Sequence, residues 1–364
     1  MKLNAIIDVL EEFAPKSLAE EYDNSGLQIG DPAMEIKGVM ISLDCTEAVI
    51  NEAIQKGCNV IISHHPLIFS GLKKISSNHY TGRAILNAIK NDVAVYSIHT
   101  NLDNISYGVN LSICRKLNLE KCSILKPKNK MLKKLYTFCP ESHIELVRTA
   151  LFKAGCGNIG DYDSCSFNTS GYGTFKPNAK ATPFSGSKNK LNEEKEIRIE
   201  TVFPAYAEKK VVEALKRTHP YEEVAFDIIT LENISDKIGS GMIGELPVTV
   251  PEMDFLHIIK KEFSADGIRY TKLRGKNIKK VSVCGGSGSF LLKDAISAGA
   301  DIFISADFKY HQFFDAEDKI IIVDIGHYES EQFVTNIIYN LLKEKFSTFA
   351  ASLSKIDTNP VNYL

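Results

Sequence analysis

The chain has 364 residues, of which 44% are hydrophobic and 24% are charged, and its formal net charge is -2 at pH 7. That length allows two or three domains with separate cores, and the composition is ordinary for a soluble protein. A charge so close to zero gives no reason to expect nucleic acid or an acidic membrane surface as a partner, and no apolar run approaches the roughly 20 residues that span a bilayer.

The first residues and the cysteines bear on the cellular compartment. The opening stretch "MKLNAIIDVLEEFAPKSLAEEYDNSG" has acidic residues where a signal peptide would be apolar, so it predicts an amphipathic helix. The eight cysteines are scattered, with no CxxC pair, which argues against a zinc finger or a thioredoxin motif. This pattern fits buried free thiols in a reducing compartment, and we expect a cytoplasmic protein.

Residues 36–117 predict short strands that alternate with helices. The apolar runs and their flanking turns predict strands at 38–44, 59–63 and 93–99, and helices at 47–57 and 82–92. This βαβ order is typical of a mainly parallel sheet that is covered on both faces.

Residues 130–235 follow a different pattern, strand–helix–strand twice over, which is the βαββαβ order of a ferredoxin-like unit. Phe138-Cys139-Pro140 and Phe203-Pro204 each close a strand before a helix, which suggests that this unit is itself duplicated. The stretch 169–195 is rich in Gly, Ser, Asn and Lys and predicts a mobile loop. We interpret residues 130–235 as a domain inserted into a two-part α/β domain.

The βαβ order returns near the C-terminus, with strands predicted at 279–285, 301–305 and 320–326 and helices at 291–300 and from about Ser330. Segments 51–65 and 293–307 align with Ala, Ile, Gly, Ile and Ser in register, and His65 then falls opposite Asp307. Because the order of helices and strands also agrees, we favour an internal repeat over chance. We therefore predict a duplicated α/β domain whose halves are 1–129 and 236–364.

The stretch "NVIISHHPLIFSGLKK" raises the question of chemistry, because a buried strand runs directly into His64 and His65. Two adjacent histidines indicate either a metal site or general base at the mouth of a sheet, or a solvated turn. Five of the nine histidines lie at or just beyond the ends of predicted strands: His64, His65, His99, His311 and His327. Ligands of open parallel sheets bind outside the carboxyl ends of the strands.

Carboxylates accompany these histidines. Asp103 follows the strand that ends at His99, and Glu331 lies four residues after His327, about one helical turn away. Imidazoles with carboxylates suit Zn²⁺, Mn²⁺ or Fe²⁺. Each feature alone has a simpler explanation, since polar pairs four residues apart are common on exposed helices and Asp103 can belong to a turn. All of them together, at equivalent strand ends, favour a metal centre.

Several motifs together resemble the GTP cyclohydrolase 1 type 2 family, also called the Ngg-interacting-factor-three-like proteins. They are "YDNSGLQIG", "SHHP", "HTNLD", "CGGSG", "ADFKYH" and "GHYESE", and they cover nearly the whole chain. The inserted segment resembles that of the longer bacterial members, which is similar to PII and CutA proteins, and "THPYEEVAFD" carries this likeness.

The resemblance implies a centre of two divalent ions, with Zn²⁺ first and Mn²⁺ or Fe²⁺ as alternatives. By motif, it implies five metal ligands: His64, His65, Asp103, His327 and Glu331. It also implies a toroidal homohexamer whose metal sites face an inner cavity, and a small molecule as substrate or ligand. The family label implies opening of the imidazole ring of GTP by metal-activated water.

Further residues at the same strand ends are candidates for other roles. His99 and His311 are candidates for a general base or for orienting a ligand, and a satisfied polar turn is an equally good explanation for both. Asp307 and Lys309 are candidates for substrate binding. The stretch "CGGSGS" resembles a phosphate-cradling turn, but it lacks GxGxxG and GxxxxGK[ST], so a tight strand–helix turn is slightly favoured.

Three classes of function follow from these residues. We favour a metal-dependent hydrolase acting on a nucleotide or another phosphate-containing substrate, because a site with no cysteine ligand and no redox partner favours hydrolysis. The alternatives are a metal-binding protein without turnover and a regulatory hexameric scaffold whose inserted domain senses a small molecule.

Overall fold

The computed structural model describes residues 1–347 and 350–364. The chain divides into two compact units, one made of residues 1–127 with 236–364 and the other of residues 128–235. The second unit begins two residues before the position expected from the sequence and ends at the expected one. Every helix in the described part of the chain is too short or too polar to cross a bilayer.

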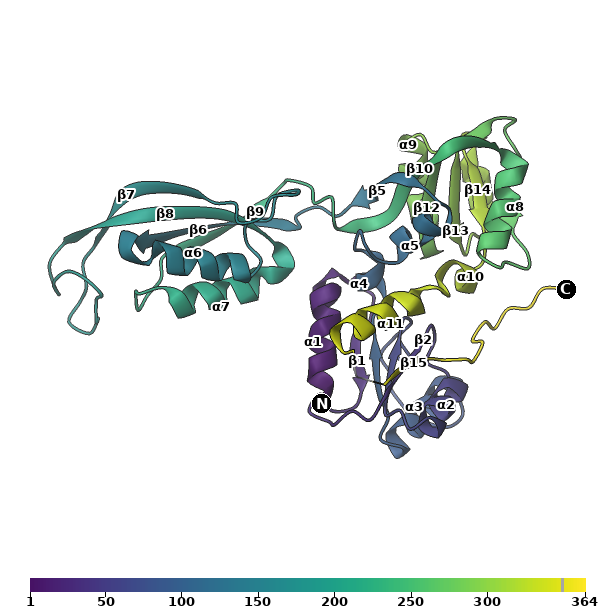
Figure 1. The fold of residues 1–364 in the computed structure, drawn as a ribbon, viewed down its shortest axis with the longest axis horizontal. Helices are drawn as coiled ribbons and strands as arrows, with labels where there is room; N and C mark the ends of the chain where they lie inside the picture. Colours follow the sequence, from purple (N-terminus) through teal and green to yellow (C-terminus); the bar gives the residue numbers. More distant parts are fainter. Residues whose placement is uncertain (348–349) are drawn as a thin grey trace. The chain divides into compact units, whose positions relative to one another are not determined.

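The first half of unit 1, together with the C-terminal strand β15, forms a five-stranded sheet in the order β1-β4-β3-β2-β15 (Figure 1). The strands are β1 (Gly26–Ile29), β2 (Val39–Ser42), β3 (Val60–Ser63), β4 (Ala94–Ser97) and β15 (Ala351–Leu353). Strands β15, β2, β3 and β4 pair in parallel, and β1 joins β4 antiparallel. Every residue of β2, β3 and β4 is buried, as expected for strands that are covered on both faces.

Helices cover both faces of this sheet. On one face, α2 (Glu47–Gln55) and α3 (Tyr80–Lys90) pack on Met40, Ile61 and Val95. The alternate strand residues face α1 (Leu3–Phe13) and α11 (Val334–Lys345) on the other side (Figure 1). Helix α2 begins after Thr46, whose hydroxyl accepts a hydrogen bond from the Val49 amide at 3.3 Å, a cap worth about 1 kcal/mol.

The second half of unit 1 forms a six-stranded sheet in the order β11-β14-β13-β12-β10-β5. The strands are β5 (Glu120–Pro127), β10 (Gly239–Pro251), β11 (Arg269–Tyr270), β12 (Asn277–Ser287), β13 (Ile302–Ala306) and β14 (Ile321–Asp324). Only β12–β13 and β13–β14 pair in parallel, while β5–β10, β10–β12 and β11–β14 are antiparallel. The prediction of mainly parallel sheets is therefore wrong for this half, because β5 leads into the second unit and β10 returns from it alongside β5.

The remaining α-helices of unit 1 come from both halves of the sequence. They are α4 (Thr100–Asp103), α5 (Val109–Lys116), α8 (Glu252–Glu262), α9 (Leu292–Ser297) and α10 (His327–Glu331). The predicted single last helix is in fact α10 followed by α11, which starts at Val334. The parallel cores β2-β3-β4 and β12-β13-β14 share the same strand order, as the proposed repeat would require.

Unit 2 is a four-stranded antiparallel sheet in the order β7-β8-β6-β9 with two helices on one face (Figure 1). Its elements follow the order strand–helix–strand–strand–helix–strand: β6 (Leu132–Pro140), α6 (Ile144–Lys153), β7 (Phe167–Phe175), β8 (Asn192–Pro204), α7 (Glu208–Thr218) and β9 (Phe226–Leu231). Leu135 and Cys139 of β6 point into the core beneath the helices.

The stretch 169–195 is not the continuous loop that its composition predicted. Strand β7 extends to Phe175 and β8 starts at Asn192, so only residues 176–191 lie outside the strands. Gly171 and Gly173 misled the prediction because glycine is depleted in strands, yet they pair with Glu196 and Glu194 of β8. Backbone pairing along an edge strand does not require a side chain.

Candidate metal centre

Most of the predicted site residues of unit 1 gather at the carboxyl ends of the two parallel cores. Strand β3 ends at Ser63, and the amides of His64 and His65 still donate to the carbonyls of Ser42 and Leu43. The two histidines therefore continue the line of the strand beyond its last paired residue. They meet α10 of the other half, which carries His327 and Glu331.

One group consists of His65, His327 and Glu331. The Nε2 atoms of His65 and His327 lie 2.9 Å and 3.0 Å from Glu331 Oε2, and 3.3 Å from each other. Two ring nitrogens that converge on one carboxylate oxygen form a donor set that suits a divalent ion such as Zn²⁺. These ligand atoms all lie within 4.8 Å of one another.

A second group consists of His64, Asp103 and Glu331. His64 Nε2 lies 3.6 Å from Asp103 Oδ1 and 3.9 Å from Glu331 Oε1, in a pocket where His64 is fully buried and Glu331 is 3% exposed. Within the described residues, neither His64 Nε2 nor Asp103 Oδ1 has a hydrogen-bond partner. Buried polar atoms almost always have one, so this donor pair fits a bound cation.

Glu331 belongs to both groups, and it presents Oε2 to one and Oε1 to the other. A carboxylate with this placement can bridge two ions. His99 forms a further group with His64 and His65, and its ring centre lies 5.3 Å and 5.5 Å from theirs. The structure thus brings together the five residues expected as ligands, with His99 beside them.

The second nitrogen of each ring is held by a neighbour. His64 Nδ1 lies 2.8 Å from the Ile98 carbonyl, which can only accept, so Nδ1 carries the hydrogen and Nε2 carries a lone pair. The Nδ1 atoms of His65, His327 and His99 each lie 2.7 Å from a carboxylate, those of Asp44, Asp307 and Asp23 respectively. Such partners fix the orientation of metal-binding histidines.

The two groups differ in protonation. Burial lowers the pKa of His64, so its ring is neutral. Burial opposes the charge on His65, but the hydrogen bonds to Asp44 and Glu331 raise its pKa to about 9. Burial likewise opposes the charge on His327, and the charge of Glu331 and the hydrogen bond to Asp307 raise its pKa to about 11.

The carboxylates divide in the same way. Burial opposes ionisation of Glu331, but the charge of His327 and the surrounding hydrogen bonds hold its pKa well below the usual range. Burial and the charge of Glu331 raise the pKa of Asp103 well above the usual value. At Asp103, burial and Glu331 thus outweigh the positive charges of His65 and His327, and a bound cation would favour the ionised carboxylate.

The stretch "CGGSGS" makes room for Glu331. Gly286 has a φ of +61°, and a Cβ there would lie 2.5 Å from Glu331 Oε1. The amides of Gly285 and Gly286 donate to Asn110 Oδ1 at 3.0 Å and Ser330 Oγ at 2.9 Å. Because these two amides are already used, the segment acts as a close backbone approach to the site and does not match the phosphate-cradling alternative.

Three other candidates have different surroundings from those expected. Asp307 accepts hydrogen bonds from His327 and Ser287, so it orients a ring of the cluster. Lys309 is exposed, and its amide donates to Gln312. His311 is exposed, and its ring contacts Tyr310 and Phe314. Neither Lys309 nor His311 lines the two cavities beside the cluster.

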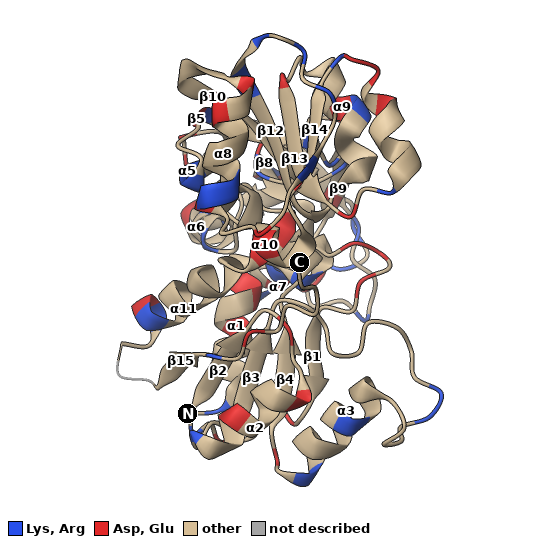
Figure 2. Cartoon of the chain, turned by 90° about the vertical axis from the view of Figure 1, so that its right-hand side faces the viewer, with Lys and Arg blue, Asp and Glu red and all other residues tan. Residues whose placement is uncertain are grey.

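Two cavities flank the cluster. One, of about 400 Å³, extends from His65, His99 and Glu331 to the exposed rings of Tyr22, Phe69 and Phe290. The other, of about 540 Å³, lies between His327 and the C-terminal segment 359–363. Figure 2 shows acidic residues on α10 and on segments facing it between the two sheets. The surroundings are therefore acidic, which favours the binding of cations at the cluster.

Sequence reasoning did not single out Asp23, Asp44 and Thr358. Asp23 lies in the early "YDNSG" motif, and its carboxylate accepts from His99 and Thr100. Asp44 is the last residue of the strand predicted at 38–44, as His99 is of the strand predicted at 93–99, and this position was an available signal. Thr358 donates to Asp44 Oδ2 at 2.6 Å from 314 residues away in the sequence, and no local pattern indicates that contact.

Comparison with known proteins gives a consistent result. The family described as Duf34/NIF3 (NGG1p interacting factor 3) matches residues 1–360. A Bacillus subtilis protein named GTP cyclohydrolase 1 type 2 homolog is 40% identical over 364 residues, which is 99% of this chain and 98% of that protein.

Solved structures match over the full length as well. A Bacillus cereus protein described as related to NIF3 has a TM-score of 0.88 at 37% identity, covering 100% of this chain and 99% of that one. A Staphylococcus aureus protein has a TM-score of 0.78 at 31% identity, with the same coverage. These matches cover both halves of unit 1 and the segment between them.

Proposed function

The chain belongs to the Duf34/NIF3 family, and we propose that it is a hydrolase that uses two divalent metal ions. The proposed ligands are His65 and His327 for one ion and His64 and Asp103 for the other, with Glu331 shared. The observation that carries this proposal is the pair of buried, unpartnered atoms His64 Nε2 and Asp103 Oδ1, 3.6 Å apart beside Glu331. We propose Zn²⁺ first, with Mn²⁺ or Fe²⁺ as alternatives.

When bound, such ions would lower the pKa of a coordinated water and polarise the bond that it attacks. The chain would provide the geometry. Asp44, Asp307 and the Ile98 carbonyl would hold the ring planes of His65, His327 and His64. His99, whose Nδ1 is bonded to Asp23, would present its other nitrogen towards the cluster and is the proposed proton acceptor.

The substrate would enter through the cavity of about 400 Å³. The ring centres of Tyr22 and Phe69 lie 6.3 Å apart at this cavity, and Phe69 also contacts His99. Exposed rings beside a metal centre suit a planar group such as a nucleobase. Relatives carry the name GTP cyclohydrolase 1 type 2 homolog, and we propose a nucleotide or another phosphate-containing compound as the substrate.

We further propose that the assembly is a toroidal homohexamer in the cytoplasm and that unit 2 is a ferredoxin-like domain of the PII and CutA kind. The second candidate function is a metal-binding or regulatory scaffold without turnover. The donor set of imidazoles and carboxylates supports it too, because the same ligands serve storage as well as catalysis.

The first test is the metal content of the purified protein, followed by a screen of nucleotides and phosphate esters with and without added Mn²⁺ and Zn²⁺. We expect two ions per chain and metal-dependent turnover that His65→Ala abolishes. The matched control is His311→Ala, which removes an exposed histidine outside the cluster. Two ions per chain with no turnover on any of these compounds would favour the scaffold. Turnover that persists in a metal-free His65→Ala variant would contradict the hydrolase.

A further inference from the structure

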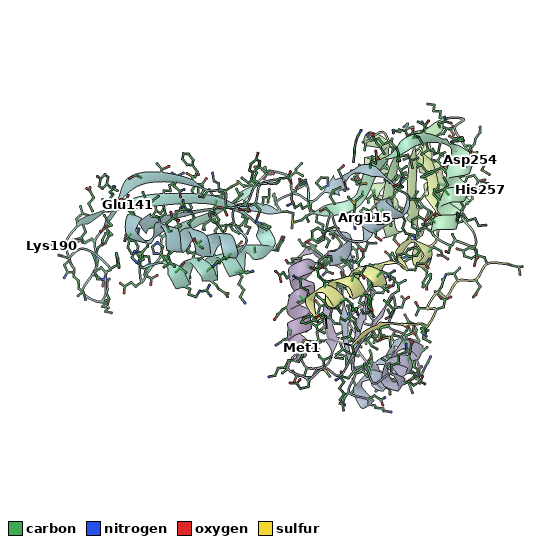
Figure 3. The ribbon with its side chains drawn as sticks, in the orientation of Figure 1. Met1, Arg115, Glu141, Lys190, Asp254 and His257 are labelled. Carbon is green, nitrogen blue, oxygen red and sulfur yellow. The ribbon has the colours of Figure 1, made fainter. Side chains whose placement is uncertain are left out.

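Unit 2 contains a cavity of about 700 Å³ that lies within residues 138–225. It opens on the face of the β7-β8-β6-β9 sheet that carries no helix, because Phe138 and Arg198 alternate with the core residues Cys139 and Ile199 along their strands. Figure 3 labels Lys190 at the end of unit 2 where β7 and β8 are joined. The volume is in the range of ligand-binding pockets, about 300–1,000 Å³.

Glycines create the hollow. Gly171 lies opposite Glu196 in the β7–β8 ladder, and a Cβ placed on it would meet no atom within 4 Å. Gly173 leaves the space that the Glu196 side chain occupies, because a Cβ there would lie 2.1 Å from Glu196 Oε2. Residues 176–185 cross above this floor, and the Thr182 amide donates to Glu222 at 2.8 Å. The cavity is therefore formed before any ligand binds.

The walls are rich in aromatic rings. Phe138, Tyr172, Phe175, Phe184 and Tyr221 all line the cavity. The ring centres of Phe184 and Tyr221 lie 5.9 Å apart, so the crossing segment and the 219–225 segment meet through aromatic contact. Aromatic rings that line a cavity can present their negative faces to a cation.

The charges in the cavity are mainly negative. Glu196, Glu222 and Glu223 line it, and none of these three forms an ion pair with another described residue. Glu196 accepts a hydrogen bond from the Tyr221 hydroxyl at 2.7 Å, which aims its carboxylate beside that ring.

The basic residues of the lining do not balance these carboxylates. Arg198 is paired with Glu200 and stacks 4.9 Å from the centre of the Tyr136 ring. Lys176 is exposed at the start of the crossing segment. Ser185 Oγ is buried at this cavity and has no hydrogen-bond partner among the described residues, so a hydrogen-bonding site is also free.

We propose that this cavity binds a small organic cation, an ammonium compound with an apolar or aromatic body. The ammonium group lies against the carboxylate of Glu196 and the ring of Tyr221, the body fills the space above Gly171, and Ser185 offers a hydrogen bond. Anionic ligands are disfavoured because three carboxylates without cationic partners line the site. The proposal concerns unit 2 alone and does not depend on metal chemistry in unit 1.

The test uses the full-length protein and isothermal titration with benzyltrimethylammonium, compared with benzyl alcohol and benzenesulfonate. We expect one benzyltrimethylammonium to bind per chain. Its affinity should be at least about tenfold higher than that of benzyl alcohol, which is uncharged, or of benzenesulfonate, which is anionic. Glu196→Gln keeps an acceptor for Tyr221 but removes the charge, and should weaken binding about tenfold. Glu193→Gln is the matched control, because Glu193 is an exposed carboxylate on the same strand outside the cavity.

Gly171→Leu provides a second variant that does not depend on charge. The backbone φ of Gly171 lies outside the left-handed region, and a Cβ there would have open space. The variant should therefore fold normally, and its leucine side chain should fill the floor of the cavity and abolish binding. Unchanged binding in Gly171→Leu, equal affinity for the three compounds, or no binding of benzyltrimethylammonium would overturn the proposal. A change in particle mass of Gly171→Leu by light scattering would also overturn it, because the face would then be an interface between copies of the chain.

Discussion

The two groups of the candidate metal centre contain the same kinds of side chain, yet without a cation they differ in whether their polar atoms have hydrogen-bond partners. His65 and His327 direct all four ring nitrogens at carboxylates, so protons can satisfy this group. His64 and Asp103 leave one buried atom each without a partner in the described structure. His65 and His327 must therefore exchange protons for a metal, whereas a metal gives His64 Nε2 and Asp103 Oδ1 a partner that they otherwise lack.

The largest effect should come from the residue that the two groups share. Glu331→Gln keeps the shape of the side chain but removes the charge, and we expect both ions to be lost, with affinity falling by more than about 100-fold, since even outer partners of metal ligands cost 10–100-fold. Metal content by mass spectrometry of the native protein measures this. Glu329→Gln, a buried neighbour on α10 that binds Asn359, is the control. Retention of both ions in Glu331→Gln would show that the groups are independent.

The group of His64, Asp103 and Glu331 should govern how metal binding affects the stability of the folded protein. Chelation should lower the thermal midpoint of the wild type, because a ligand at 100 times its Kd stabilises the folded state by about 2.7 kcal/mol. Burial and the charge of Glu331 oppose the ionisation of Asp103 in the metal-free protein, so Asp103→Asn removes an unfavourable group and the metal-free protein should become more stable, by about 1–3 kcal/mol. The metal-dependent part of the stability should shrink.

Differential scanning calorimetry of both proteins, with and without a chelator, separates these effects. His311→Ala should behave like the wild type under all conditions. If Asp103→Asn destabilised the metal-free protein, Asp103 would have a partner in solution, and the distinction between the two groups would be wrong.

The group of His65, His327 and Glu331 should determine how metal binding depends on pH. The pKa values of His65 and His327 are raised to about 9 and about 11, so both rings are protonated at pH 7.5 in the metal-free protein. A metal requires the neutral ring, so binding should release about two protons from these two rings, in addition to any proton that Asp103 holds because of its raised pKa. Release should fall towards one as the pH rises through about 9, and affinity should increase over the same range.

Titration calorimetry in two buffers of different ionisation enthalpy counts these protons. His64 should contribute none, because burial lowers its pKa. The variant His327→Ala should release about one proton fewer than the wild type at pH 7.5. Proton release that is absent, or that rises with pH, would contradict the assigned protonation states.

Sequence patterns predicted the parts of this molecule that depend on neighbours along the chain. The apolar runs before His64 and before His99 located β3 and β4, and motif strings such as "SHHP" carried a family resemblance that is confirmed. The assignment of the five metal ligands stays a prediction, although the structure brings those residues together.

The errors come from contacts between distant segments. The antiparallel pairing of β10 with β12 depends on where the chain re-enters the sheet after unit 2, and no periodicity encodes it. Gly171 and Gly173 read as loop residues because their low strand propensity is overridden by pairing with β8. His311 shares its strand-end position with the clustered histidines, but η5 (Tyr310–Ala316) directs it elsewhere.

The smallest effect should come from the C-terminal segment, whose Thr358 hydroxyl donates to Asp44, which in turn accepts from His65. Asp44→Ala should weaken metal binding about 10–100-fold because the His65 ring loses its orienting partner. Thr358→Ala removes one hydrogen bond, worth about 1 kcal/mol, and should weaken binding only about fivefold. Thr335→Ala, which removes a hydroxyl that donates to the Gln332 carbonyl, is the control.

In the double variant, loss of the Thr358 hydroxyl should add nothing to loss of the Asp44 carboxylate, because the hydroxyl acts on the metal only through that carboxylate. Additive losses, measured by competition with a metal-binding dye, would mean that Thr358 reaches the site by another route.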